Sequence, residues 1–293
     1  MLFSSHTSQF AKALGTDKAV RILAEAGFPA IDCTMFNMGH FPHVENYRER
    51  ARELRAYADA NGVVFNQAHA PFGGGAENYT KKLVPTFPRC FEAVAILGIK
   101  NIVVHPIQNG RYYGNEESLF HQNIEFYSSL APLAKEYGVK IAIENMWQRH
   151  PVTRAICDDV CAPPEELSRY YDTLNDPTVF TVCLDLGHVA LCGREPENAI
   201  RTIGGERLGA LHVHDVDYLD DLHTLPGVGK IKWDNVCHAL ADINYSGDFT
   251  LECENFVAYL DPEQYPFAAR YMAQTAGYLA NKIERYKREN QAM

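Results

Sequence analysis

The sequence predicts an α/β protein folded as a single (β/α)8 TIM barrel. Short apolar or β-branched runs alternate with longer amphipathic stretches, which is typical of strand–helix units around a parallel sheet. The alternation occurs eight times along the chain, and eight such units close into a barrel. The chain has 293 residues, a length at which α/β barrels commonly form one domain. We therefore expect one domain over residues 1–293.

The first four units each pair a short apolar strand with a helix. The strands are expected at residues 1–4, 30–34, 63–68 and 101–104. The helices are expected at residues 17–26, about 44–60, about 79–97 and 116–137. Glycine often closes a helix, because the closing residue adopts a left-handed backbone conformation that glycine tolerates best. Such glycines stand at positions 27, 62, 98 and 138.

The last four units repeat this pattern. The strands are expected at residues 139–143, 179–184, 208–213 and 248–251, and the helices at about 164–174, about 196–203, 233–242 and about 266–289. Residues 179–184 are almost continuously hydrophobic, as in a strand that is buried on both faces. Pro163 and Pro164 suit the first turn of the helix that they begin. The longest connections, 35–43, 145–163 and 214–232, fall on the face where barrel active sites are built.

The composition excludes some classes of partner. The net charge of −10 disfavours nucleic acid, because phosphate binding requires a basic face. No apolar run reaches the roughly 20 residues that span a bilayer, and the first residues do not resemble a secretion signal. We therefore expect a cytoplasmic protein without a membrane partner. Its eight cysteines are expected to be reduced, and Cys157 and Cys161 are the pair to inspect for a disulfide.

Histidine and carboxylate residues follow each of the last six expected strands. They are His69, His105, Glu144, Asp185, His188, His212, His214, Asp221, His223, Glu252 and Glu254. A single buried carboxylate is usually paired with Lys or Arg, because an unpaired buried charge is costly. Few Lys or Arg residues stand at these strand ends, and several carboxylates that meet at one barrel mouth would repel one another. A shared divalent cation removes that repulsion.

Four of these residues form the expected ligand set. They are Glu144, Asp185, His212 and Glu252. Side chains alternate along a strand, so His212 and His214 share a face, as do Glu252 and Glu254, and the earlier member of each pair lies deeper. We expect His214 and Glu254 at the rim or in contact with the ligands. Three carboxylates and one imidazole suit a divalent metal, Mn²⁺ first, with Mg²⁺, Co²⁺ or Zn²⁺ as alternatives.

Short motifs at these positions resemble the xylose-isomerase-like superfamily of TIM barrels. They are H-A-P at His69, H-P at His105, I-E-N at Glu144, L-D-x-G-H around Asp185, H-x-x-D at His212, L-P-G-x-G from Leu225 and L-E at Glu252. In this order, the motifs extend over nearly the whole chain. The superfamily holds sugar isomerases, ketose 3-epimerases, inosose dehydratases and apurinic endonucleases of the endonuclease IV type.

The resemblance to the sugar epimerases implies one divalent metal in the four-residue set. Glu144 and Glu252 would also be the catalytic acid and base, and would move a proton next to a carbonyl through a metal-bound enediolate. The residues expected to contact the substrate are His188, His69, His105, Trp147 and His223. The expected function is a metal-dependent isomerase or epimerase of a sugar or sugar derivative.

The endonuclease branch implies a different chemistry with the same side chains. Three zinc ions would be held by the four ligands together with His69, His105, His188, Asp221 and His223. The acidic chain and the lack of basic clusters after the first two strands favour a sugar over DNA. Trp147 also suits the apolar face of a sugar.

The substrate and two further functions stay open. Tyr218 stands where several 3-epimerases carry an arginine, and Val228 stands where an acidic residue is frequent, so the substrate contacts depart from the usual ones. A dehydratase or lyase acting on a keto-polyol or sugar would use the same metal. A non-catalytic sugar-binding or partner subunit would keep the barrel fold but not the catalytic chemistry. A homo-oligomer is a further expectation from the resemblance.

Overall fold

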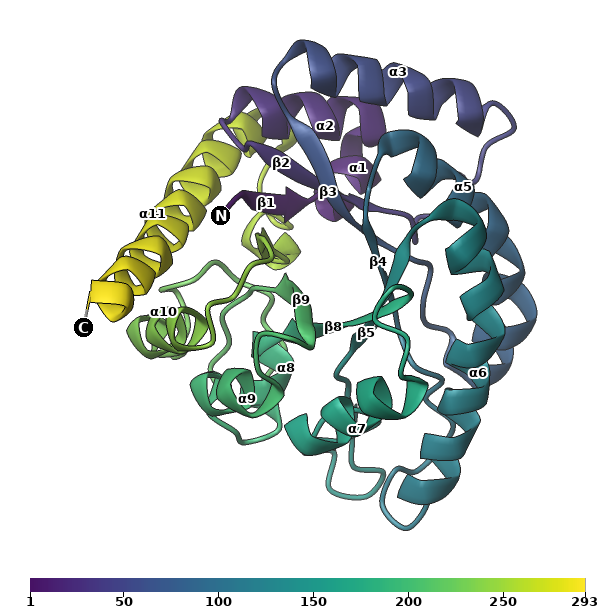
Figure 1. Cartoon of the computed structure of the whole chain (residues 1–293). Coiled ribbons are helices and arrows are strands. Elements are labelled where there is room, and N and C mark those ends of the chain that lie inside the picture. Colours follow the sequence, from purple (N-terminus) through teal and green to yellow (C-terminus); the bar gives the residue numbers. More distant parts are fainter. Residues whose placement is uncertain (293) are drawn as a thin grey trace.

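Eight parallel strands close into a barrel at the centre of the structure (Figure 1). The computed structural model describes residues 1–292. The barrel strands are β1 (Phe3–His6), β2 (Ala30–Thr34), β3 (Val64–His69), β4 (Asn101–Val104), β5 (Lys140–Glu144), β8 (Phe180–Asp185), β9 (Leu208–His212) and β10 (Phe249–Leu251). They follow chain order, and β10 pairs with β1. A bridge between Val213 and Leu251 joins β9 to β10, which confirms the expected (β/α)8 TIM barrel.

Helices surround the barrel and mostly lie where the sequence places them (Figure 1). They are α2 (Thr16–Glu25), α3 (Tyr47–Ala60), α5 (Phe87–Leu97), α6 (Glu116–Tyr137), α7 (Pro164–Leu174), α9 (Pro196–Ile203), α10 (Trp233–Asp242) and α11 (Tyr265–Ala292). The helix expected at about 79–97 is wrong over its first eight residues. There the chain forms a π-helical turn (Tyr79–Leu83) and a 3-10 turn (Val84–Thr86) before α5. Pro85 and Pro88 interrupt the α-helical hydrogen bonds because proline has no N–H.

Several short elements lie in the loops and were not expected. They are the helices α1 (Ser8–Leu14), α4 (Gly75–Asn78) and α8 (Leu186–Leu191), the antiparallel hairpin of β6 (Trp147–Arg149) and β7 (Ile156–Asp158), and the 3-10 turns Glu254–Phe256 and Pro262–Gln264. Most of them follow a barrel strand directly. They therefore shape the mouth of the barrel.

The interior of the barrel is narrow and lined by small side chains. Val103, Ala142, Cys183 and Ala210 form a separate buried cluster there. Each stands two residues before a histidine or carboxylate of the expected site, namely His105, Glu144, Asp185 and His212. Residues two apart on a strand share a face, so those four side chains form the next layer inside the barrel, at its carboxyl end.

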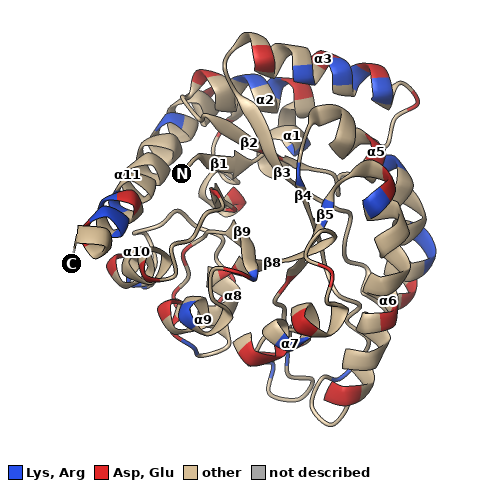
Figure 2. Cartoon of the chain, in the orientation of Figure 1, with Lys and Arg blue, Asp and Glu red and all other residues tan. Residues whose placement is uncertain are grey.

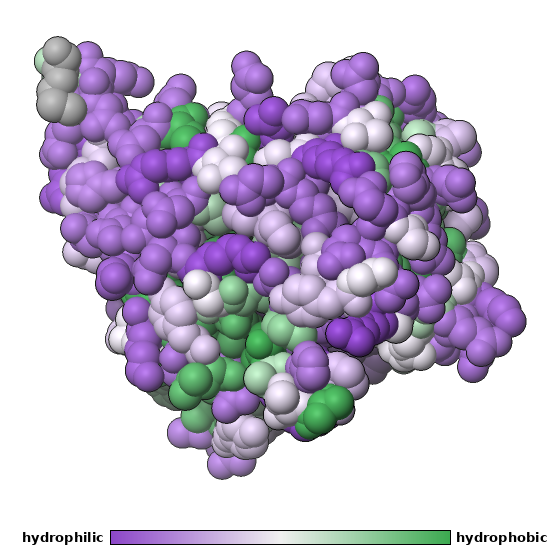
Figure 3. Space-filling model, turned by 90° about the horizontal axis from the view of Figure 1, so that it is seen from below, coloured by the Kyte–Doolittle hydropathy of each residue, from purple (hydrophilic) through white to green (hydrophobic). Residues whose placement is uncertain are grey.

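The described residues contain neither a helix that could span a membrane nor a disulfide. Among residues 1–292, no helix is long and apolar enough to cross a membrane. The face seen in Figure 3 is mostly hydrophilic, with a limited cluster of apolar side chains. The eight cysteines are free, and Cys157 and Cys161 are not joined. Only Cys157 and Cys192 are not fully buried.

Candidate metal centre

Glu144, Asp185, His212 and Glu252 meet at the carboxyl ends of four strands. The first three are the last residues of β5, β8 and β9, and Glu252 follows β10 directly. One ligand atom from each lies within 4.8 Å of the others. All four side chains are buried, with at most 6% of any residue exposed. The barrel therefore brings together the four residues expected to bind a metal.

The contacts within this group leave lone pairs for a cation. His212 Nδ1 lies 2.7 Å from Glu144 Oε1 and 3.1 Å from Glu252 Oε2. Glu144 Oε2 is buried without a hydrogen-bond partner, although His105 Nε2 lies only 2.9 Å from it. A buried carboxylate oxygen that lacks a hydrogen bond is costly unless it binds a cation. The set of three carboxylates and one imidazole fits a divalent ion.

The two glutamates differ in acidity. Burial raises the pKa of Glu252 well above its ordinary value of 4.5, because the histidines His212 and His223 do not offset the desolvation. Glu144 is desolvated as well, but His212 and His105 outweigh the effect and hold its pKa well below 4.5. Two carboxylates whose pKa values are driven apart are typical of an acid and base in one site.

His69 and His105 form a second group with Glu144. One atom from each of the three lies within 4.8 Å of the others, and the two Nε2 atoms are 3.1 Å apart. His69 Nδ1 donates to the backbone carbonyl of Ala70 at 2.8 Å, so Nε2 carries the lone pair of the ring, which can accept from His105 Nε2 or bind a metal. Burial lowers the pKa of His105 to about 4. His105 is therefore neutral at pH 7, as a ligand or hydrogen-bond acceptor must be.

A third group lies beside the four-residue set and contains His188, His214, Asp221 and His223. His188 stands in the first turn of α8, and its backbone N–H donates to Asp185 Oδ1 at 2.6 Å. Asp185 is thus the N-cap of α8 as well as part of the ligand set. His188 Nδ1 donates to the carbonyl of Asn145 at 2.8 Å. His223 Nε2 lies 3.2 Å from Asp221 Oδ2.

Of the two positions expected for His214, at the rim or in contact with the ligands, the structure has the second. His214 is fully buried, and its Nε2 lies 3.0 Å from Asp185 Oδ1. Its ring stacks on that of His223 at a centroid distance of 3.9 Å. Strand β9 ends at His212, so alternation along a strand no longer fixes the direction of residue 214. Glu254, by contrast, does line the pocket as expected.

His6 and Asn145 were missed as candidate site residues. His6 ends β1, and its Nε2 lies 3.3 Å from Glu254 Oε2. The sequence-based strand stopped at residue 4, which left His6 in a loop. Asn145 is buried, its Oδ1 accepts the N–H of Asp185 at 2.8 Å, and its Nδ2 donates to the carbonyl of Asp185 at 3.0 Å. The I-E-N motif contained this residue, but its partner lies 40 positions away.

A pocket of about 500 Å³ opens above the ligand set. Its lining consists of Phe36, Phe72, Gly73, His105, Gln108, Glu144, Met146, Trp147, His188, Asp221, His223, Glu252, Glu254 and Asn255. The volume suits a small organic ligand. Phe36 and Phe72 pack edge to face at 5.0 Å and supply an apolar wall. Trp147 projects from β6 beside His188, with ring centroids 6.4 Å apart.

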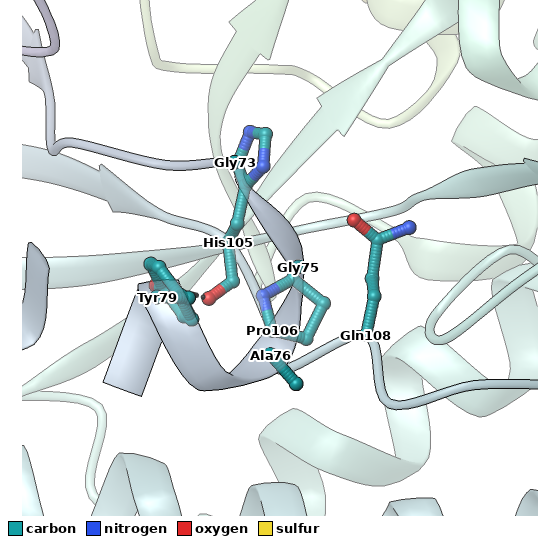
Figure 4. A pocket seen from close by; sticks show the side chains of 7 residues that line it. All are labelled: Gly73, Gly75, Ala76, Tyr79, His105, Pro106 and Gln108. Carbon is teal, nitrogen blue, oxygen red and sulfur yellow. Dashed lines mark hydrogen bonds between the residues drawn. The ribbon is translucent and has the colours of Figure 1, made fainter. Parts of the chain in front are cut away.

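A smaller recess of about 40 Å³ adjoins the pocket, between α4 and the end of β4 (Figure 4). The Tyr79 hydroxyl donates to the backbone carbonyl of His105 at 2.7 Å. This bond attaches the segment after β3 to the end of β4, and so fixes the backbone of His105. The recess has room for a water molecule or two but not for a sugar.

None of the described residues that line the large pocket is Lys or Arg. Figure 2 shows Lys and Arg mainly on the outer helices, such as α3 and the C-terminal half of α11. A nucleic-acid backbone is recognised largely through Lys and Arg. The charge distribution therefore matches a small uncharged ligand better than DNA.

The sequence matches the model of a protein family described as xylose isomerase-like TIM barrel, over residues 20–275. An uncharacterised protein of Methanocaldococcus jannaschii is 28% identical, over 69% of this chain and 68% of that protein. An inosose isomerase of Bacillus subtilis is 24% identical, over 74% and 72%. An inosose dehydratase of Clostridium perfringens is 28% identical, over 56% and 57%.

Three of the solved structures with the same fold cover nearly the whole chain. A D-tagatose 3-epimerase-like protein has a TM-score of 0.73 at 21% identity and covers 99% of both chains. The IolI protein with a bound zinc atom has a TM-score of 0.73 at 21% identity, over 98% of this chain and 99% of that one. A D-psicose 3-epimerase studied with D-fructose has a TM-score of 0.71 at 19% identity, over 95% and 99%. At these identities the similarity establishes the fold.

Proposed function

The chain belongs to the xylose isomerase-like TIM barrel family, and from this premise we propose that it is a divalent-metal-dependent isomerase or epimerase of a sugar or polyol ketone. The observation that carries the proposal is the meeting of Glu144 and Glu252 with Asp185 and His212 at the floor of the pocket. Two carboxylates beside one cation site supply an acid and a base for moving a proton next to a carbonyl.

The four-residue set would hold the metal, with Mn²⁺ as the first choice and Mg²⁺, Co²⁺ or Zn²⁺ as alternatives. A solved relative of the same fold, IolI, binds zinc. When bound, the metal would polarise the substrate carbonyl and so acidify the neighbouring C–H. No Lys or Arg lines the pocket, so none of the described lining residues holds the carboxylates in a permanent salt bridge.

The chain's own residues would move the proton and hold the substrate. One glutamate, Glu144 or Glu252, would remove the proton next to the carbonyl, and the other would return a proton. Return to the opposite face of the same carbon is epimerisation, and return to the neighbouring carbon is isomerisation. The residues that would contact substrate hydroxyls or the apolar sugar face are His188, His69, His105, Trp147 and His223.

Dehydration is a variant of the same chemistry. The inosose dehydratases and inosose isomerases that resemble the chain act, by their names, on the same kind of cyclic polyol ketone. In a dehydratase the proton next to the carbonyl is removed in the same way, and a hydroxyl then leaves from the adjacent carbon. The pocket therefore suits either isomerisation or dehydration, and identification of the reaction product distinguishes the two reactions.

A substrate screen in D₂O tests the proposal. The metal-stripped protein would be loaded separately with Mn²⁺, Mg²⁺, Co²⁺ or Zn²⁺ and offered free ketoses, phosphorylated ketoses and inososes. We expect deuterium to enter one substrate next to its carbonyl, only with metal present. Sugar binding without exchange or turnover across the panel would contradict the proposal and favour a non-catalytic sugar-binding subunit.

A phosphodiesterase of the endonuclease IV type is the second candidate, and the three adjacent ligand groups favour it. They contain the full set of nine residues that this chemistry requires, including Asp221 and His223. It predicts about three zinc ions per chain and cleavage of abasic DNA. Metal analysis of the purified protein, with an abasic duplex in the screen, separates it from the one-metal sugar enzyme.

A further inference from the structure

Gln108 lines the pocket from the connection between β4 and α6, three residues after His105. The backbone just before it is fixed by Asn123 of α6, which is fully buried. Asn123 Oδ1 accepts the N–H of Ile107 at 2.6 Å, and Asn123 Nδ2 donates to the carbonyl of Ile107 at 3.0 Å. The core therefore sets the position from which the Gln108 side chain enters the pocket.

The amide group of Gln108 is held in one orientation. Its Nε2 donates to the backbone carbonyl of Trp147 at 3.2 Å and to Asp159 Oδ2 at 2.7 Å. A carbonyl and an ionised carboxylate can only accept hydrogen bonds, so a flipped amide would bring Oε1 against two oxygens. Asp159 is itself buried, and its Oδ1 accepts the N–H of Val160 at 2.8 Å. The chain thus satisfies the nitrogen side of the amide and fixes where the oxygen points.

The amide oxygen of Gln108 faces away from these partners. Both hydrogen bonds of the side chain use Nε2, so Oε1 has no donor among residues 1–292. In the view of Figure 4, the oxygen lies on the side of His105 and the nitrogen on the far side. The side chain lines the same pocket as Glu144 and Glu252. A carbonyl oxygen held in this way can accept a hydrogen bond from a ligand in the pocket.

We propose that Gln108 determines specificity for one free hydroxyl group of the substrate, whose O–H donates to Gln108 Oε1. The inference rests on the proposed function, in which a sugar or polyol ketone binds with its carbonyl beside Glu144 and Glu252. Such a ketone carries further hydroxyls away from the reacting carbons. Because the two bonds of Nε2 hold the amide, Oε1 cannot turn away to suit a ligand that lacks the donor. An analogue with hydrogen in place of that hydroxyl leaves Oε1 unpaired and therefore binds more weakly.

Calorimetric titration of matched variants with deoxy analogues tests this role. The metal-loaded protein would be titrated with ketohexoses, inososes and the monodeoxy analogues of each. For one hydroxyl, we expect its removal to raise the Kd of the wild type about tenfold. Gln108→Met keeps the length of the side chain without its polar atoms, and should bind the parent ligand and that analogue equally. Its preference at the other hydroxyls should match that of the wild type.

Gln148→Met is the control variant. Gln148 lies next to Trp147 in the β6–β7 hairpin, and its Nε2 donates to the carbonyl of Asp158 at 3.0 Å, but it is not among the residues that line the pocket. This variant also loses an amide that bonds the hairpin backbone, and it should discriminate between the ligands as the wild type does. A loss of discrimination in Gln148→Met equal to that in Gln108→Met would overturn the direct contact.

The pattern across the ligands separates recognition from support of the Trp147 wall. If Gln108→Met binds the parent and every analogue more weakly by the same factor, or discriminates as the wild type does at every hydroxyl, the proposal is overturned. Partial unfolding of the variant does not disturb the comparison, because both ligands are measured on the same protein. Failure of the proposed chemistry alone looks different, since the discrimination would depend on Gln108 but no deuterium would enter the ligand in D₂O. Absence of binding across the whole panel would overturn both.

Discussion

Glu252 combines a raised pKa with a position in the ligand set, so its substitution is the most direct test of the proposed chemistry. Glu252→Gln keeps the size of the side chain but removes its charge and its ability to exchange a proton. We expect turnover to fall by about 10²–10⁴, the usual contribution of general acid–base catalysis. Glu263→Gln is the matched control, because Glu263 is exposed in the 3-10 turn before α11 and is not among the residues that line the pocket. A fully active Glu252→Gln enzyme would disprove the proposed role.

Asn145 holds two site residues in place without belonging to the ligand set. Its side chain bonds both backbone polar groups of Asp185, and its carbonyl accepts from His188. Residues that orient metal ligands typically contribute 10- to 100-fold in affinity. We expect Asn145→Ala to weaken metal binding by at least about tenfold, measured by competition with a chelating dye. Asn255→Ala, at a pocket residue without these bonds, should bind metal as the wild type does. Equal affinities for the two variants would show that Asn145 is dispensable.

Asp215 organises the long connection between β9 and α10. Its carboxylate accepts from the N–H groups of Val216 and Ile231, both at 3.0 Å, and from Gly227 and the Trp233 indole, both at 2.8 Å. Asp215→Ala would leave buried donors unsatisfied at about 1–3 kcal/mol each. We expect urea unfolding to show a loss of about 3 kcal/mol. Because this connection carries Asp221 and His223, hydrogen exchange should also increase there.

Asp217 provides the control for that experiment. It lies in the same connection and bonds only the nearby N–H groups of Leu219 and Asp220, at an exposed position. Asp217→Ala should therefore cost no more than about 0.5 kcal/mol. Similar losses for the two variants would mean that Asp215 does not organise the loop.

The strand and helix elements were predictable to the extent that hydrophobic periodicity determines them. The bounds of β2, β4, α6, α7, α9 and α10 are those expected from the sequence. The short helix α8 was not expected, because residues 186–191 continue the apolar run of β8, and the bond from the His188 N–H to the Asp185 side chain that caps the helix is not visible in a hydrophobic pattern. The hairpin β6–β7 was also missed, since strands of three residues are too short to show alternation.

The candidate site was predictable in composition but not in its internal contacts. Strand ends of a barrel converge, so a list of strand-end residues already contained the four members that meet. The depth of His214 and the role of Asn145 depend on contacts with Asp185 from other strands, which no local pattern encodes. To find His6, the end of β1 had to be predicted to within two residues. Sequence patterns do not locate the ends of strands that closely.

Asp248 lies at the opposite end of the barrel from the pocket, where residues affect stability rather than catalysis. Burial raises the pKa of its carboxyl above the ordinary value of 3.8, despite a hydrogen bond from Asn66 and the nearby amino terminus. The folded state therefore binds this proton more tightly than the unfolded state, and ionisation destabilises the fold as the pH rises through the folded pKa. We expect Asp248→Asn to raise the Tm by about 1–2 °C at pH 7. No difference is expected at pH 3, where both side chains are neutral. An equal shift at both pH values would exclude ionisation as the cause.

The ligand set joins the ends of β5, β8, β9 and β10, so metal binding should stabilise the whole barrel. An ion that binds only the folded protein adds about 2.7 kcal/mol at a concentration of 100 times its Kd. For a chain of this size we expect the Tm of the metal-stripped protein to rise by about 5 °C or more when the preferred ion is added. If residues 1–293 form one domain, as we infer, calorimetry should show a single transition that moves as a unit. Asp185→Asn should abolish the metal-induced rise but keep the cap of α8, because asparagine caps a helix about as well as aspartate. A wild-type Tm that is insensitive to Mn²⁺, Mg²⁺, Co²⁺ and Zn²⁺ would contradict the metal site, whereas two transitions of which only one responds would contradict the single domain.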